Sequence, residues 1–279
     1  MSGPRIALVL GKPPERSPVL PDVIARLDGR AEVMVHVPSR GAPVDPVAWS
    51  LRTADLVAVR GLGQRALAAL AVVEDAGVRC CNRIAATLAV RDRVLVHRLL
   101  TAAGVPVPAT TEVPTWEDVT AGAAGSVMVK AVDGRSGRGT GVLPAPDGVL
   151  PTEPPFPGPY LVQRFVPNDG RDRKLYVIGD RVAGLLKRWP RAPGDQEAGV
   201  PFPVEPDLEA LARRVGAAIG LELYGVDVVV GPGGPAVVDV NPFPSCSGVQ
   251  GAATSIAEHL LVAASGPAVA QRLAGGTPA

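Results

Sequence analysis

Aromatic residues are scarce in this sequence: they make up 4% of 279 residues, against 47% for hydrophobic residues as a whole. The core must therefore be built mainly from valine, leucine, isoleucine and alanine. An excess of charge of one sign is also lacking, because the formal net charge is +1. This balance gives no electrostatic reason to expect nucleic acid or a membrane surface as a partner. No apolar run is long enough to span a bilayer, so we expect a soluble protein.

Cysteine and histidine are equally rare, with three residues of each. Cys80 and Cys81 are neighbours and Cys246 stands alone, so the spacing matches no metal-ligand motif. The histidines are far apart in the sequence and belong to no recognisable metal motif; they are His36, His97 and His259. This cysteine usage is typical of a reduced protein, and we expect a cytoplasmic location.

The first eighty residues alternate between short apolar segments and helical patterns. Runs rich in Val and Ile predict buried strands at residues 5–11, 32–37, 56–60 and 78–81. Apolar residues at helical spacing predict helices at residues 19–27 and 64–76. Such alternation indicates a parallel sheet with helices on its faces, and hence an α/β fold.

The remaining two hundred residues mix helices with hairpins. The pattern predicts, in chain order, one helix at 84–103, a strand at 160–166, a hairpin at 174–189, a polar loop at 190–204, a helix at 207–219 and a hairpin at 223–240. We divide the chain into an N-terminal α/β domain (1–84), a central subdomain (85–165) and a C-terminal subdomain (166–279).

The last hairpin carries carboxylates inside runs that are otherwise apolar. Asp239 and Asn241 share a strand face because they are two residues apart. If Val230 pairs with Ala236 across the turn, Asp227 falls opposite Asp239 on that face. Two carboxylates and an amide oxygen suit Mg²⁺, a hard cation that prefers oxygen. The alternative is that Asp227 pairs with an arginine and Asp239 simply ends a strand; that is the better explanation for either acid alone, but not for the three together.

A second signal is Lys130, which ends an apolar strand and precedes a glycine-rich run at residues 133–141. Glycines let backbone N–H groups approach phosphate oxygens closely, and a lysine neutralises phosphate charge. Glycine-rich hairpin tips are common, however, and the Gly-Lys-Ser/Thr sequence of a P-loop is absent. Taken alone, the segment is more often an ordinary hairpin than a phosphate site.

Taken in order along the chain, these pieces resemble the ATP-grasp superfamily. The resemblance rests on the segments at 82–110, 129–131 with its glycine loop, 161–166 (LVQRFV), 170–174 (GRDRK), 185–188 (LLKR), 225–227 (GVD) and 238–244 (VDVNPFP). The sequence is most similar to the branch with the ribosomal-protein glutamate ligases, the amino-group-carrier-protein ligases and the inositol polyphosphate kinases. The resemblance implies an ATP-grasp fold that follows the N-terminal parallel-sheet domain in the chain.

The resemblance also implies roles for individual residues. ATP phosphates would be contacted by Arg93, Lys130, Ser136 and Gly137, adenine by the hinge of Gln163, Arg164 and Val166, and Mg²⁺ by Asp227, Asp239 and Asn241. Arg188 matches the arginine near the transferred phosphoryl group, and the neighbouring Lys187 would assist it. Lys174 stands where a substrate-facing arginine is usual, and a lysine cannot grip a carboxylate with the same fork.

The resemblance implies a carboxylate–amine ligase that uses ATP and Mg²⁺ and forms an acyl phosphate before the amide bond. Its partners would be a small-molecule or peptide carboxylate and an amine, with a homodimer left open. A second interpretation is a kinase acting on a polyol or inositol phosphate, which needs one co-substrate and releases no phosphate. A third is a non-catalytic nucleotide-binding protein, against which the intact set of metal ligands argues.

Overall fold

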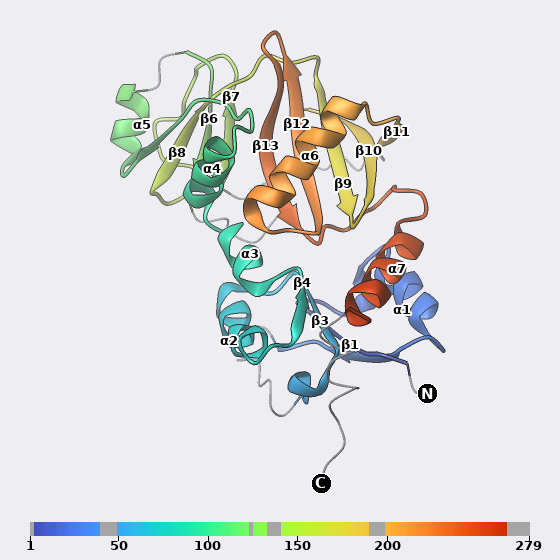
Figure 1. The fold of residues 1–279 in the computed structure, drawn as a ribbon. Helices are drawn as coiled ribbons and strands as arrows, with labels where there is room; N and C mark the ends of the chain where they lie inside the picture. The colour runs from blue at the N-terminus through green and yellow to red at the C-terminus, as the bar shows by residue number, and fades with distance from the viewer. Residues whose placement is uncertain (1–2, 40–48, 123–124, 133–140, 190–198, 267–279) are drawn as a thin grey trace.

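The computed structural model describes residues 3–39, 49–122, 125–132, 141–189 and 199–266. Within these residues the strands form three sheets: one N-terminal sheet, and two further sheets that lie side by side above it in Figure 1. The predicted α/β class is confirmed. No helix in the described part of the chain is long and apolar enough to cross a membrane.

The N-terminal sheet is parallel throughout, as predicted, with the strand order β2-β1-β3-β4. Its strands are β1 (Arg5–Leu10), β2 (Glu32–His36), β3 (Leu56–Arg60) and β4 (Arg79–Cys81). Short 3₁₀ turns at Pro14–Arg16 and Leu51–Thr53 and the helices α1 (Leu20–Leu27), α2 (Gln64–Asp75) and α7 (Ala252–Ala264) surround it.

Alternating side chains of β1 divide the core of this sheet in two. Ile6 and Leu8 pack with α1 and α7 on one face, whereas Ala7 and Val9 pack with α2 on the other. Because α7 comes from the C-terminal end of the described chain, it ties that end to the N-terminal sheet (Figure 1).

The helix expected at 84–103 is wrong in one respect: the chain forms two helices, α3 (Ile84–Ala89) and α4 (Arg93–Ala102). Asp92 begins the second helix, because its carboxylate accepts a hydrogen bond from the backbone N–H of Leu95 at 3.0 Å. This break places Arg93 at the first position of α4.

The central sheet is antiparallel, with the strand order β5-β8-β6-β7. Its elements are β5 (Thr110–Val113), α5 (Trp116–Gly122), β6 (Val127–Ala131), β7 (Val142–Ala145) and β8 (Tyr160–Arg164). Val127 and Val129 pack against Val119 of α5, so Met128 and Lys130 point to the opposite face of the sheet.

The third sheet has the order β11-β10-β9-β12-β13 and is antiparallel. It comprises β9 (Arg171–Ile178), β10 (Arg181–Arg188), β11 (Val200–Phe202), α6 (Pro206–Ile219), β12 (Leu223–Gly231) and β13 (Gly234–Pro242). The loop expected at 190–204 is wrong in part, because residues 200–202 form β11 and pair with β10. Helix α6 covers one face through a mainly apolar contact. The other face is left for polar side chains.

Candidate active site

The β12–β13 hairpin brings the predicted metal ligands together by an unexpected route. Val230 pairs with Pro235 rather than with Ala236, so the expected register is wrong by one residue at the turn. The pairing then skips Val238, a β-bulge that restores Asp227 to a position directly opposite Asp239. Bulges re-aim side chains, and this one places both carboxylates on one face.

Asp239 also lies beside Asn241, whose amide Nδ2 donates to Oδ2 of Asp239 at 3.1 Å. The residue Asp239 is exposed to solvent. Even so, desolvation by nearby protein atoms, followed by the facing carboxylate of Asp227, raises the pKa of Asp239. Two carboxylates this close repel each other unless a cation stands between or beside them. This face of the hairpin therefore carries several oxygen atoms and excess negative charge, which a cation would stabilise.

Lys174 meets part of this demand from the neighbouring strand β9. Its Nζ lies 2.8 Å from Oδ2 of the buried Asp172 and forms an ion pair with Asp227, its cross-strand neighbour. Burial lowers the pKa of Lys174, but Asp227 and Asp172 outweigh burial and raise it well above its ordinary value. Lys174 thus stays charged and is held by two carboxylates of the protein itself.

Lys187 and Arg188 leave strand β10 on opposite faces, because side chains alternate along a strand. Lys187 pairs across the sheet with Asp172, on the face of Asp227. Arg188 pairs with Arg171 and belongs by alternation to the face that packs on α6. The register therefore brings Lys187 toward the carboxylates and does not bring Arg188 there.

Lys130 approaches the hairpin from the central sheet. Its Nζ donates to the carbonyl oxygen of Val238, the bulge residue, at 2.7 Å. Burial lowers the pKa of Lys130 to about 8, although Asp239 opposes the shift. The bulge thus has a second consequence: it leaves a carbonyl free to fix a lysine beside the carboxylate pair.

Arg93 contacts the backbone at both ends of the glycine-rich segment. Its Nη1 donates to the carbonyl oxygen of Ala131, just before that segment, at 2.7 Å and to that of Gly141, the last residue of the segment, at 3.3 Å. Ser136 and Gly137, predicted to contact phosphate, lie outside the described residues.

A cavity of about 50 Å³ separates the central sheet from β13 and α4. Its polar lining includes Lys130, Gln163 and Asp239, and its apolar lining includes Leu161 and Val240. The amide of Gln163 donates to the hydroxyl of Thr110 at 3.1 Å and is thereby oriented within the wall. The cavity is narrow, yet it places apolar surface next to the charged groups just described.

The predicted adenine hinge follows Gln163 at the end of β8. The N–H group of Arg164 donates to the carbonyl oxygen of Ala109 at 2.8 Å and is not free to meet a ligand. The N–H group of Val166, by contrast, has no hydrogen-bond partner among the described residues. Of the two hinge positions, Val166 is therefore the one whose N–H can reach a ligand.

Arg60, at the end of β3, was not predicted from the sequence. Its Nε donates to the carbonyl oxygen of Phe243 at 3.2 Å, and its guanidinium lies 5.8 Å from the centre of that ring. Burial lowers its pKa, and in the described part of the chain no carboxylate pairs with it. Phe243 follows the predicted metal ligand Asn241 by two residues, so Arg60 contacts the chain just beyond that predicted ligand. Its position where parallel strands end was the available signal.

Comparison with known proteins shows the family and the fold of the chain. No family model matches the chain. A probable alpha-L-glutamate ligase of Xanthomonas euvesicatoria pv. vesicatoria (strain 85-10) is 30% identical over 216 residues, which is 70% of this chain and 72% of that protein. This chain belongs to the alpha-L-glutamate ligase branch of the ATP-grasp family. A second relative, from Sodalis glossinidius (strain morsitans), is 28% identical over 200 residues, covering 66% of this chain and 67% of its own.

Solved structures extend the likeness to nearly the whole ligase chain. A RimK domain protein of the ATP-grasp type from Sphaerobacter thermophilus superimposes with a TM-score of 0.68 at 25% identity, covering 94% of this chain and 100% of that one. The D-alanine–D-alanine ligase of Bacillus anthracis gives 0.69 at 14% identity, covering 99% and 100%, which shows the fold alone. The predicted ATP-grasp fold is confirmed, as is an ATP-dependent ligase that joins a carboxylate to an amine; the relatives do not favour the kinase.

Replacing Lys130 by Met should weaken ATP binding, because methionine has a similar shape but no charge. The protein should stay as stable, because the replacement removes a buried charge. We expect a loss on the order of 1.5–3 kcal/mol, the range for a charge-assisted hydrogen bond. Since burial lowers the pKa of Lys130 to about 8, affinity should fall as the pH rises from about 7 to about 9 in every protein that keeps Lys130, and not in Lys130→Met. Calorimetry with a non-hydrolysable ATP analogue measures both effects, with Arg98→Met on the exposed side of α4 as the control. An unchanged dissociation constant for Lys130→Met would contradict the assignment.

A paired substitution tests the two faces of β10. Lys187→Ala should lower the turnover number about tenfold or more, because its charge lies on the face of the carboxylates. Arg188→Ala should leave turnover within about twofold of wild type, because its side chain leaves on the other face. Steady-state kinetics of both variants decides the matter. The reverse order of effects would restore Arg188 as the group near the transferred phosphoryl, as the family resemblance alone predicts.

Proposed function

We propose that this ligase uses Mg²⁺ and ATP to join L-glutamate, as the amine, to a carboxylate of a peptide or protein. The observation that carries the proposal is the shared face of Asp227, Asp239 and Asn241, with Lys130 fixed beside it. The substrates are suggested by relatives named probable alpha-L-glutamate ligase and by the fold neighbour PsnB, solved with a precursor peptide. The reduced cysteines fit a cytoplasmic setting.

Mg²⁺ fits the donor set of the hairpin. Asp227, Asp239 and the amide oxygen of Asn241 would hold it, since this ion takes oxygen ligands and combines protein carboxylates with phosphate oxygens. Bound there, the ion would supply neutralisation of the phosphate charge. It would compete with the ammonium of Lys174 for Asp227, and Asp172 would keep Lys174 at the site.

The nucleotide would lie between the central sheet and β13. Lys130 and Arg93 are placed for its phosphates, and the N–H of Val166 is placed for an adenine nitrogen. Ser136 and Gly137 stay predicted phosphate contacts. In this position the phosphates would lie next to the carboxylate face of the hairpin, where Asp227, Asp239 and Asn241 would hold the ion.

Arg60 is our candidate for the substrate carboxylate. Its Nη groups have no hydrogen-bond partner among the described residues, and a guanidinium offers a fork that matches a carboxylate. A carboxylate oxygen held there would attack the γ-phosphorus as ADP departs, and the amine would then displace phosphate from the acyl phosphate. The protein supplies positioning and positive charge, from Arg60, Lys130 and Lys187.

The proposal predicts that ADP and inorganic phosphate form together, and only when ATP, an acceptor peptide and L-glutamate are all present. A coupled assay for both products over a panel of peptides and amino acids tests it. Asp239→Asn should lower turnover by about a hundredfold or more without loss of stability, because it removes a metal ligand and a like-charge repulsion. Asp22→Asn, on the exposed side of α1, is the matched control.

ADP formed without inorganic phosphate, with a single co-substrate, would instead indicate a kinase. Products formed at wild-type rates by Asp239→Asn would remove the metal assignment but leave the ligase activity standing. The two parts of the proposal therefore fail separately.

A further inference from the structure

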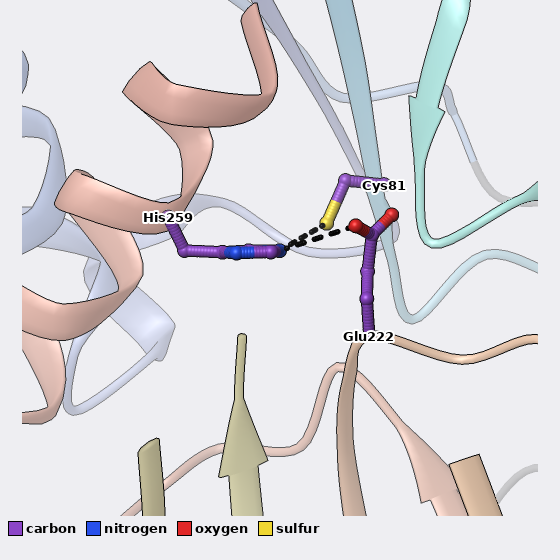
Figure 2. Close-up of side chains that lie close together, drawn as sticks. All are labelled: Cys81, Glu222 and His259. Atoms are coloured by element: carbon purple, nitrogen blue, oxygen red, sulfur yellow. Dashed lines mark hydrogen bonds and ion pairs between the residues drawn. The ribbon is translucent and has the colours of Figure 1, made fainter. Parts of the chain in front are cut away.

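A second cluster of ligand atoms lies far from the hairpin face, where the N-terminal sheet meets the third sheet. Cys81 ends β4, Glu222 directly precedes β12, and His259 lies on α7 (Figure 2). One potential ligand atom of each residue lies within 4.8 Å of the other two. Nε2 of His259 is 3.6 Å from Sγ of Cys81 and 3.6 Å from Oε2 of Glu222. Three elements distant in sequence thus present a thiol, an imidazole and a carboxylate to one point.

We propose that Cys81, Glu222 and His259 bind one Zn²⁺ ion. Tetrahedral zinc has bonds of about 2.3 Å to sulfur and about 2.0–2.2 Å to nitrogen or oxygen, so neighbouring ligand atoms stand about 3.4–3.6 Å apart. The two separations from Nε2 of His259, to Sγ of Cys81 and to Oε2 of Glu222, are both 3.6 Å. These two separations match tetrahedral zinc, while Sγ of Cys81 and the Glu222 oxygen lie within 4.8 Å of each other and would draw together around the ion, with a water as the fourth ligand.

The protonation states allow this binding with one proton released. Burial, and then Glu222, raise the pKa of the Cys81 thiol, so the thiol is protonated before the ion arrives. Binding forms the sulfur–zinc bond and sends that proton to solvent. Burial lowers the pKa of His259, so its ring is neutral and its Nε2 can offer a lone pair when the proton is on Nδ1.

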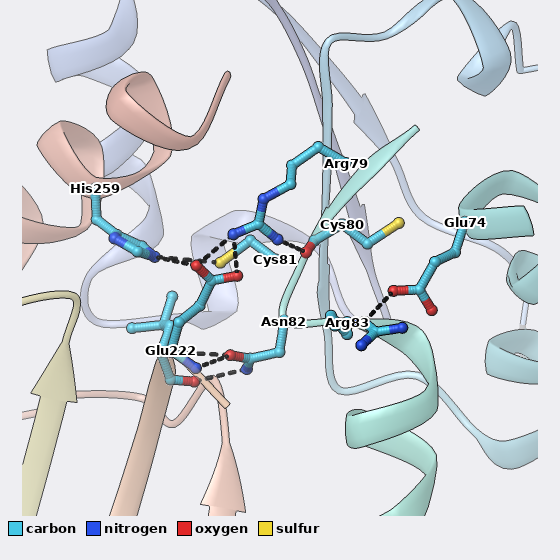
Figure 3. A network of polar contacts seen from close by, with 9 residues as sticks. Glu74, Arg79, Cys80, Cys81, Asn82, Arg83, Glu222 and His259 are labelled. Carbon is cyan, nitrogen blue, oxygen red and sulfur yellow. Dashed lines mark hydrogen bonds and ion pairs between the residues drawn. The ribbon is translucent and has the colours of Figure 1, made fainter. Parts of the chain in front are cut away.

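The surroundings hold the ligands in place. Arg79 donates to both oxygens of Glu222, at 2.7 and 2.5 Å, and can keep one of them while the other binds the ion (Figure 3). Asn82, which is fully buried, accepts from the backbone N–H groups of Glu222 and Leu223 at 2.9 and 2.8 Å. Its amide donates to the carbonyl oxygen of Leu223 at 2.7 Å. These bonds fix the start of β12 against the residue that follows Cys81, as outer partners do in metal sites.

Room for the imidazole comes from the β9–β10 turn. A Cβ added at Gly179 would lie 2.7 Å from Nδ1 of His259, so the glycine lets the ring reach the cluster. The alternative is that no ion binds, and that Arg79, Glu222 and His259 form only a network of hydrogen bonds and ion pairs between the two sheets. That alternative makes a different prediction for a metal titration.

The test is a Co²⁺ titration of the full-length, chelator-treated protein without nucleotide, followed by absorption. A thiolate–cobalt bond gives a near-ultraviolet charge-transfer band that oxygen ligands do not give. We expect this band to saturate at one equivalent in wild type and to be displaced by Zn²⁺. Cys81→Ser should abolish the band, and His259→Gln should weaken Co²⁺ binding at least about tenfold.

Two matched controls complete the experiment. Cys80→Ser removes the adjacent thiol, which points to the carbonyl of Val78 on the other side of the strand, and should keep the band. Asp239→Asn should keep it too, since the hairpin site holds no sulfur. Absence of the band in wild type, or its persistence in Cys81→Ser, would overturn the proposal. If Cys81→Ser does not fold, wild type and His259→Gln still decide it.

Discussion

Two carboxylates face each other across the β12–β13 hairpin, and the rest of the site is arranged around their repulsion. Asp227 and Asp239 meet because the ladder skips Val238. The same bulge frees the carbonyl that fixes Lys130, while Lys174 neutralises Asp227 from the next strand. One local irregularity of the backbone thus places both the carboxylate pair and Lys130. It also joins the central sheet to the third sheet at the place where the nucleotide would bind.

The apolar layers explain why this face can be so polar. Helix α6 buries the opposite face of the third sheet, so burial on that side stabilises the strands without help from the carboxylate side. Lower on the polar face, Tyr176, Leu185 and Phe243 pack in the core that also contains α1 and α7. The charged residues are therefore confined to one end of the sheet, between an apolar core and the central sheet.

Much of the fold, and part of the candidate site, could be predicted from the sequence. Strand–helix alternation gave the parallel sheet, and the order of motifs gave the family, because both depend on local patterns. Alternation along β10 would also have separated Lys187 from Arg188, had the side-chain period been applied there. The helix break before Arg93 had a signal in Asp92, a favoured N-cap residue.

Other features depend on packing and had no local signal. The bulge at Val238 adds one residue to a run of valines that reads as regular strand. Arg60 is close to Phe243 only after the N-terminal sheet docks on the third sheet. Cys81, Glu222 and His259 have no motif spacing, since 141 and 37 residues separate them. Their assembly is a consequence of α7 returning to the N-terminal sheet, which periodicity cannot reveal.

We propose that the carboxylate face of the hairpin binds the metal of a metal–nucleotide complex. The most direct test is the affinity for a non-hydrolysable ATP analogue, measured calorimetrically with and without Mg²⁺, in wild type and in Asp239→Asn. We expect Mg²⁺ to strengthen binding about tenfold or more in wild type, within the usual range of coupling between two ligands. In Asp239→Asn this strengthening should fall to within about twofold, while binding without Mg²⁺ is unchanged or tighter because a negative charge is gone. An equal effect of Mg²⁺ on both proteins would show that Asp239 does not bind the metal.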